Sequence, residues 1–273
     1  MTARFPTSPR GMVASFWDNR NLIGLLVKRE AVGRYQGSVL GLLWSFFHPL
    51  LMLTVYTFVF SMVFKARWNV GGESRTVYAL VLFSGLMVFS LFAECINRAP
   101  SLILGNVNYV KKVVFPLEIL PWVALGSAFF HMVVSLIVWM GFYVVIFGAP
   151  PVTALLLPLV LVPLVLTVMG LSWLLASLGV YLRDVTHIVS VVTSVLMFLT
   201  PIFYPLAALP ESVQPWLYFN PLTVVVEQTR DVLILNKMPH WPVWGLFVAA
   251  SFVIAWAGFA WFQRTRRGFA DVL

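Results

Sequence analysis

The side chains that could do chemistry are sparse in this sequence, and their spacing matches no familiar catalytic or metal site. No G-x-x-x-x-G-K-[S/T] phosphate loop occurs, so ATP binding of that kind is excluded. The sequence contains no H-E-x-x-H pattern, and its four histidines have no spacing that suggests one site: His48, His131, His187 and His240. The chain is therefore predicted to be non-catalytic and to hold no metal or cofactor of its own.

Two isolated polar residues lie in apolar surroundings. The single cysteine, Cys95, excludes an internal disulfide and is predicted to be a small packing residue. His48 precedes Pro49 within an apolar segment, where a polar group is costly. We expect His48 to cap the backbone that the proline leaves unpaired, and a functional role is the alternative.

Aromatic side chains are the abundant residues with a chemistry of their own. The sequence has 23 Phe, 11 Trp and 8 Tyr, and several of them lie deep in apolar segments. Aromatic faces stack on the C–H groups of sugar rings and let a long polymer slide. The candidates for lining such a path are Trp44, Phe47, Tyr56, Phe198, Phe203 and Tyr204. For any one of them, lipid contact or packing is the alternative.

The elements that would position these aromatics are membrane-spanning helices. Hydrophobic residues make up 60% of the chain and charged residues 10%, with a mean hydropathy of +0.92, so much of its surface must face lipid. The apolar runs are continuous rather than alternating, which favours helices over a barrel. Six spans are predicted, at Val39–Phe64, Val77–Ile96, Ile119–Phe147, Val152–Tyr181, Ile188–Leu206 and Trp241–Phe262.

Basic residues give the predicted spans an orientation. Thirteen Lys and Arg lie in the two terminal segments and in the second and fourth connections, against five in the other connections. The positive-inside rule therefore places both termini in the cytoplasm. The net charge of +8 is explained by topology and anionic headgroups, and nucleic acid is not a predicted partner. The span interiors are expected to lack ionisable residues, so that energy must come from another chain.

The predicted organisation is an N-terminal cytoplasmic segment, residues 1–38, followed by a permease domain, residues 39–273. Apolar and basic residues interleave over Phe16–Tyr35, which predicts an amphipathic helix in the membrane interface or, alternatively, a basic topology anchor. Its candidate interface residues are Arg29, Glu30, Arg34 and Tyr35. The connection at 97–118 carries basic and aromatic residues and is predicted to form a short helix ending near Pro116, a plain basic loop being the alternative.

The outer connection Leu206–Lys237 is long and rich in proline and aromatic residues. Asn220-Pro221 is a helix-start signal, and the apolar segment that follows has about the length of half a span. We expect a re-entrant pair of short helices over 207–235, with an amphipathic helix lying flat on the outer surface as the alternative. The residues predicted to form this periplasmic gate are Trp216, Tyr218, Asn220, Pro221, Glu227 and Arg230.

Several short motifs resemble one known family. Lys28-Arg29-Glu30, Arg34-Tyr35, Leu40-Gly41 and Pro49-Leu50 are similar to the opening of the ABC-2 type permeases that export polysaccharides and teichoic acids. Later matches, in the same order, are Lys111-Lys112-Val113-Val114-Phe115-Pro116, Tyr181-Leu182-Arg183-Asp184, Thr200-Pro201-Ile202-Phe203-Tyr204-Pro205 and Tyr218-Phe219-Asn220-Pro221-Leu222. Together they extend from about Leu22 to Leu235.

The resemblance implies a function and an assembly. Such permeases are homodimers in the bacterial inner membrane, docked on two copies of a separate ATPase that binds ATP and Mg. The second and fourth connections would contact that ATPase, through Asn106, Asn108, Tyr109, Lys111, Lys112, Phe115, Tyr181, Arg183 and Asp184. The first and fifth spans would line a channel, and the gate would close its periplasmic side. The implied cargo is a glycan on undecaprenyl diphosphate.

Within this family, O-antigen export is the first interpretation, and the motifs do not fix the glycan or the end group that is recognised. Export of capsule or teichoic acid is the near alternative. Two alternatives belong to a different class of function. The chain could be a permease of the same superfamily that exports a drug or a small lipid, or it could be a non-catalytic membrane scaffold.

The charge distribution makes a direct prediction about topology. Reporter fusions at Gly148 and near Glu211 should read as periplasmic, and a fusion near Lys112 should read as cytoplasmic, because Lys and Arg resist translocation. A pair of fusions to alkaline phosphatase and green fluorescent protein at each position measures this. A cytoplasmic reading at Glu211 would contradict the six-span interpretation.

Overall fold

The computed structural model describes residues 6–59, 75–111 and 115–273, and the regular structure within these ranges is α-helix with short 3-10 turns. The all-helical prediction is therefore confirmed for the part of the chain described. Four helical segments are long and apolar enough to cross a membrane, Val77–Ser101, Leu117–Phe147, Val152–Tyr181 and Trp241–Val272. The chain is thus a multi-pass membrane protein. The first predicted span is described only up to residue 59, and the count of six stays a prediction.

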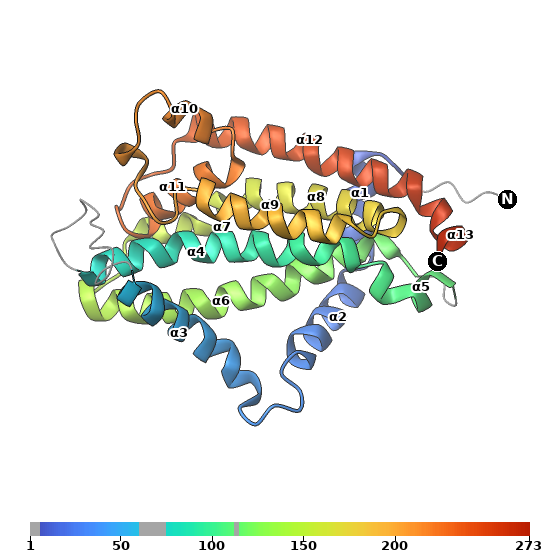
Figure 1. Cartoon of the computed structure of the whole chain (residues 1–273), viewed down its shortest axis with the longest axis horizontal. Coiled ribbons are helices and arrows are strands. Elements are labelled where there is room, and N and C mark those ends of the chain that lie inside the picture. The colour runs from blue at the N-terminus through green and yellow to red at the C-terminus, as the bar shows by residue number, and fades with distance from the viewer. Residues whose placement is uncertain (1–5, 60–74, 112–114) are drawn as a thin grey trace.

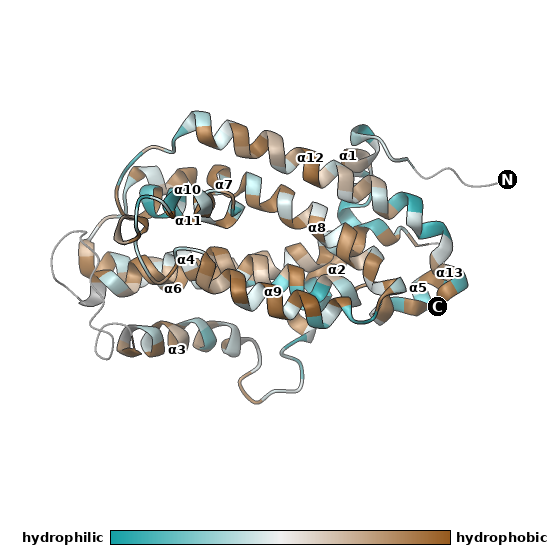
Figure 2. Cartoon of the chain, turned by 45° about the horizontal axis from the view of Figure 1, so that its top comes forward, coloured by the Kyte–Doolittle hydropathy of each residue, from teal (hydrophilic) through white to brown (hydrophobic). Residues whose placement is uncertain are grey.

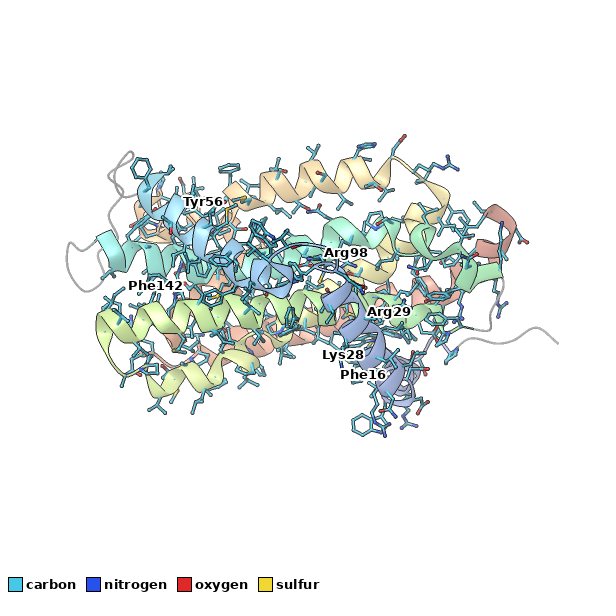
Figure 3. All side chains as sticks on the ribbon, turned by 90° about the horizontal axis from the view of Figure 1, so that it is seen from below. Phe16, Lys28, Arg29, Tyr56, Arg98 and Phe142 are labelled. Carbon is cyan, nitrogen blue, oxygen red and sulfur yellow. The ribbon has the colours of Figure 1, made fainter. Side chains whose placement is uncertain are left out.

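The predicted N-terminal amphipathic segment forms two helices, α1 (Pro9–Asp18) and α2 (Arg20–Gly33). Helix α2 buries Ile23 and Leu26 against Ile119 and Val123 at the start of α6 (Leu120–Phe147). The opposite face of α2 is exposed and carries Lys28 and Arg29 (Figure 3). This division of faces is the one that an interface helix needs.

A glycine-containing elbow joins α2 to α3 (Trp44–Phe58). Gly37 and Gly41 have φ angles of +88° and +48°, which residues with a Cβ rarely adopt. The chain therefore turns back sharply, and α2 and α3 form a V on one side of the molecule (Figure 1). Because α3 stands at an angle to the other long helices, part of its aromatic surface is left uncovered, with Trp44 at 45% and Phe47 at 44% exposure.

The long helices α4 (Arg75–Arg98), α6, α8 (Val162–Tyr181) and α12 (Trp241–Thr265) run side by side (Figure 1). A 3-10 turn at Val152–Leu156 and a short helix, α7 (Leu157–Val160), precede α8. Helix α4 is central, with 83% of its apolar stretch buried. Helix α9 (Val185–Leu199) has only 15 residues and shows an exposed apolar face. Hydrophobic residues dominate all these helices, and hydrophilic ones gather toward their ends (Figure 2).

The connecting segments divide between the two ends of the bundle. Helices α5 (Val107–Lys111) and α13 (Phe269–Val272) lie at one end, whereas α10 (Gln214–Leu217) and α11 (Pro221–Leu233) lie at the other (Figure 1). Asn220 caps α11, its side chain accepting a hydrogen bond from the amide of Leu222 at 3.1 Å. Ten residues of α11 are buried, so this helix is packed inside the molecule rather than laid on its outer surface.

Helices α8 and α12 approach each other closely, and two glycines make this possible. A Cβ built at Gly258 would lie 2.0 Å from the carbonyl oxygen of Gly170, and one at Gly170 would lie 2.4 Å from the carbonyl oxygen of Ile254. Thr167 and Ser251 add a hydrogen bond of 2.9 Å across the same contact. Small residues let helix backbones pack tightly where lipid gives no hydrophobic driving force.

The close contact predicts that Gly258→Ala destabilises the protein by about 1–3 kcal/mol, because the added methyl group overpacks the interface. Thermal unfolding in detergent micelles measures the effect. Gly245→Ala on the same helix is the matched control, since a Cβ there meets no atom within 4 Å and alanine favours the helix. Equal loss of stability in the two variants would contradict the packing described.

Candidate functional site

Two hollows border the predicted path residues. The larger, of about 610 Å³, is lined by the elbow, α3, α4 and α6 and includes Trp44, Tyr56, Glu94 and His131. The smaller, of about 560 Å³, lies beneath α10 and includes Glu227 and Arg230 together with residues of the 205–218 segment. The first has the size of a ligand pocket and mixes aromatic with polar walls.

The structure brings together predicted aromatics from α3 and from the end of α9. The rings of Tyr56 and Phe203 lie 6.2 Å apart, and those of Phe203 and Phe198 lie 5.8 Å apart. Tyr204 joins the same group by donating its hydroxyl to the carbonyl of Phe198 at 3.0 Å. We call Tyr56, Phe198, Phe203 and Tyr204 the aromatic ladder. Such rings at 4.5–7 Å make favourable edge and offset contacts.

The remaining aromatic candidates on α3 lie apart from the ladder. Trp44 lines the larger cavity, whereas Phe47 is exposed and does not line it. In the described part of α3, Trp44, Phe47 and Phe58 are exposed, whereas Tyr56 packs against the core.

An ion-pair cluster that the sequence did not reveal lies on the wall of the larger cavity. Arg34, next to the elbow, donates to Glu94 of α4 at 2.7 Å and lies 3.1 Å from Nδ1 of His131 on α6. The same Nδ1 is 3.0 Å from the second carboxylate oxygen of Glu94. Three elements that are distant in sequence are therefore joined by one carboxylate.

The cluster continues toward α2. Arg98 pairs with Glu30 of α2 and lies 3.6 Å from Glu94. Figure 3 shows Arg98 beside the half of α2 that carries Lys28 and Arg29. Two arginines are thus matched by two glutamates, which lowers the cost of placing charge close to apolar helices. Next to it, burial raises the pKa of Tyr35, so its phenol stays neutral at physiological pH.

Two expectations need correction at this cluster. The spans were expected to lack ionisable residues, but Glu94 lies inside α4, within the segment Val77–Ser101 that is apolar enough to span. The histidines were expected to be scattered, yet His48 and His131 line the same cavity. A histidine in the middle of a predicted span was the available signal, because such groups in lipid need partners.

A buried arginine organises the opposite end. Arg230 of α11 is 3% exposed, and its guanidinium donates to the carbonyls of Pro201 at 2.7 Å and Ile202 at 2.9 Å. Its Nε approaches the carbonyl of Val81 on α4 at 3.4 Å. Glu227, one turn earlier on α11, accepts from the same guanidinium at 2.7 Å.

These contacts fall where α9 ends. Proline at 201 cannot continue the hydrogen-bond ladder, so the carbonyls around it need other donors. Tyr78 of α4 adds one by donating to the carbonyl of Phe203 at 3.0 Å, and Asn220 donates to the hydroxyl of Thr200 at 2.9 Å. The turn Thr200–Tyr204 is therefore held from α4 and from α11.

The other predicted gate residues surround this turn. Pro221 occupies the first turn of α11, where its missing amide costs nothing. Tyr218 lines the smaller cavity and is about half exposed, and Trp216 is 73% exposed. Trp216 therefore faces outward and is not among the residues that line the smaller cavity.

The residues predicted to contact an ATPase gather at the far end of the bundle. Tyr109 stacks on Phe115 with ring centres 4.2 Å apart, and Arg29 of α2 donates to the Tyr109 hydroxyl at 3.2 Å. Asn106 donates its side-chain amide to the carbonyl of Leu102, which closes the turn before α5. The exposed residues there are Asn108, Lys111, Tyr181, Arg183 and Asp184. Lys112 lies outside the described residues.

Comparison with known proteins identifies the family. The model of the ABC-2 type transporter family matches residues 21–234, so the chain belongs to that family. The O-antigen export system permease protein RfbA of Myxococcus xanthus is 28% identical over 95% of this chain and 98% of its own length. RfbA of Klebsiella pneumoniae is 26% identical over 93% and 95%. The polysialic acid transport protein KpsM of Escherichia coli is 26% identical over 77% and 80%.

The Arg230 contacts predict that Arg230→Met lowers the free energy of unfolding by about 3–5 kcal/mol, since buried carbonyls and Glu227 lose their donor. Arg230→Lys should lose part of this stability, because one ammonium cannot reach all the acceptors of a planar guanidinium. Thermal unfolding in micelles measures both effects. The exposed Arg264→Met on α12 is the control, and an unchanged melting temperature in Arg230→Met would refute the assignment.

Proposed function

We propose that this chain is the membrane-spanning subunit of an ATP-driven exporter that moves a lipid-linked polysaccharide, O-antigen in the first place, across a bacterial inner membrane. The observation that carries the proposal is the similarity to O-antigen export permeases over nearly the full length of both chains. The sequence contains no phosphate loop, so ATP and Mg would be bound by a separate ATPase subunit.

The proposed assembly is a homodimer on two ATPase copies, with six spans per chain and both termini in the cytoplasm. The exposed apolar face of α9 and the incompletely covered α3 would meet their counterparts in the second copy. The aromatic ladder and Trp44 would then face the space between the copies. Stacking surfaces of this kind suit a neutral or weakly charged sugar chain, because they hold rings without anchoring one particular charge.

The periplasmic gate is proposed at α10 and α11, as a re-entrant pair. The burial of α11 and its attachment to the Thr200–Tyr204 turn support this role. The gate would close the outer end of the path when Arg230 holds the turn, and the smaller cavity leaves space for the segment to move. At the other end, the connections around α5 and Tyr181–Asp184 would dock on the ATPase.

The carrier of the glycan is proposed to be undecaprenyl diphosphate. Capsule export is the second candidate, and the similarity to a polysialic acid transport protein favours it specifically. Both candidates share a sugar polymer as cargo, whereas teichoic acid has a phosphate in each repeat and a drug efflux substrate has no polymer at all. The nature of the accumulated material in a deletion strain distinguishes these cargoes.

Deleting the gene in its native host tests the proposal. The deletion should remove the polysaccharide from the cell surface and accumulate lipid-linked glycan in the cytoplasm, and the intact gene on a plasmid should restore export. Extraction of the lipid-linked fraction and analysis of its sugars and phosphate identify the cargo. An unchanged surface polysaccharide combined with increased sensitivity to hydrophobic drugs would support efflux and contradict polysaccharide export.

The aromatic ladder gives the matching test of the path. Tyr56→Ala and Phe203→Ala should each slow export roughly fivefold, and the double variant roughly thirtyfold, if stacking on the cargo contributes about 1 kcal/mol per ring and the two effects add. Phe252→Ala on α12, a partly exposed aromatic far from the ladder in sequence, is the control. Membrane levels of each variant are measured by immunoblot, and normal export by the double variant at normal levels would remove the ladder from the path.

A further inference from the structure

The two connections proposed to dock on the ATPase are held by a third segment that the sequence did not single out. After α12, the chain continues through a 3-10 turn, Arg266–Gly268, into α13. This segment lies at the same end of the bundle as α5 (Figure 1). Phe269 within it is fully buried, with its ring 5.5 Å from that of Phe262, so the segment is packed in place.

Arg266 fixes this C-terminal segment to the second connection, residues 97–118. Its guanidinium pairs with the carboxylate of Glu118 and donates to the carbonyl of Phe115 at 2.8 Å. Both side chains of the ion pair are 12% exposed. The carbonyl of Glu118 in turn accepts from the indole of Trp173 on α8 at 2.9 Å, and that indole is buried. The end of the connection is thus clamped between the C-terminal segment and α8.

The rest of the second connection is fixed to the same C-terminal segment. Phe115, whose carbonyl Arg266 holds, stacks on Tyr109 in a nearly parallel arrangement of 14°. Lys111 of α5 donates to the backbone carbonyl of Leu273. A displacement of α5 would therefore also displace the contacts of Arg266 and the end of α12.

The fourth connection contacts the same segment from the other side. Tyr181, the last residue of α8, donates its hydroxyl to the carbonyl of Thr265 at 3.0 Å, and its ring lies 6.1 Å from that of Phe269. A Cβ at Gly268 would lie 2.7 Å from the Tyr181 hydroxyl oxygen, so glycine admits this contact. Ser177 and Thr265 share a further hydrogen bond of 2.6 Å.

We propose that Thr265–Leu273 is a bridge that unites the second and fourth connections into one composite docking surface for the ATPase subunit, with Arg266 as its positioning residue. The proposal rests on the proposed function, which supplies the ATPase. The exposed charged residues of the surface are Lys111, Arg183, Asp184, Arg264, Arg267 and Asp271. Four are basic and two acidic, so the surface fits an ATPase face with an acidic excess.

The bridge has a mechanical consequence. An ATPase that moves one connection moves the other and the end of α12 with it, because all three are fixed to one segment that the buried Phe269 anchors in the bundle. Arg266 acts through Glu118 and the Phe115 carbonyl and is itself only partly exposed. Its loss should therefore uncouple ATP turnover from export more than it weakens the charge attraction between the subunits.

The test uses the chain coexpressed with its ATPase and reconstituted in vesicles of its host's lipid extract. Arg266→Lys keeps the charge but loses the fork that reaches two acceptors at once. Arg10→Lys, on α1 and exposed but outside the docking surface, is the matched control. The measurements are copurification of the ATPase, ATP turnover, and polysaccharide export per ATP hydrolysed.

We expect Arg266→Lys to reduce export per ATP roughly tenfold while the ATPase still copurifies, and Arg10→Lys to change it less than about twofold, since an exposed arginine outside the docking surface keeps its charge as lysine. The exchanged pair Glu118→Arg with Arg266→Glu should recover part of the coupling by restoring the ion pair. If Arg266→Lys fails to accumulate, Tyr181→Phe tests the same bridge. This variant removes the hydroxyl that donates to the carbonyl of Thr265, and it should also reduce export per ATP.

The outcomes separate the two proposals. Wild-type coupling in Arg266→Lys, or in Tyr181→Phe where the first variant does not accumulate, overturns the bridge and leaves the proposed function intact. Equal losses in the Arg266 and Arg10 variants overturn the positioning role, because the loss would then not depend on the contacts of Arg266. Failure of the wild-type chain to bind any ATPase overturns the proposed function itself.

Discussion

The structure depends on one constraint, which is that backbone carbonyls left unpaired where a helix ends inside a membrane protein must find donors. Helix α9 ends after 15 residues, or about 22 Å at 1.5 Å per residue, which is short of the roughly 30 Å of a hydrocarbon core. The Thr200–Tyr204 turn follows α9 and packs against α11. Arg230 is buried at their junction and donates to the carbonyls of Pro201 and Ile202. A cation is therefore tolerated because the turn requires it, and the same cation attaches α11 to the turn.

Paired charges serve a related purpose at the other end of the bundle. Arg34, Glu94 and His131 fix the elbow between α2 and α3, and Arg266 with Glu118 fixes the C-terminal segment to the connection after α5. Between these two ends, the helices are held by apolar packing and by the close approach of α8 and α12. The specific polar contacts are thus concentrated where segments must keep a defined position, and the exposed surfaces of α3 and α9 are left to lipid or to a second copy.

Much of this organisation was predictable from the sequence, because spans, helix starts and turns leave local patterns. Asn220-Pro221 predicted the start of α11, and the interruption of its apolar run marked Glu227 and Arg230 as gate residues. The Arg34–Glu94–His131 cluster was missed because its members are 60 and 37 positions apart, and no local period encodes such pairing. Arg266 and Glu118, 148 positions apart, were missed for the same reason. The departure of α3 from the bundle depends on the glycine elbow and could not be predicted from hydropathy.

The most direct test of this account is a reversible lock on the proposed gate. Asn220 donates to the hydroxyl of Thr200 at 2.9 Å, so cysteines at these two positions should form a disulfide between α11 and the turn. The native Cys95 is buried and should not interfere. Export by the Thr200→Cys, Asn220→Cys variant should stop on oxidation and return on reduction, while either single variant exports under both conditions. Undiminished export with the crosslink complete would contradict the claim that this segment must part from the turn for the cargo to pass.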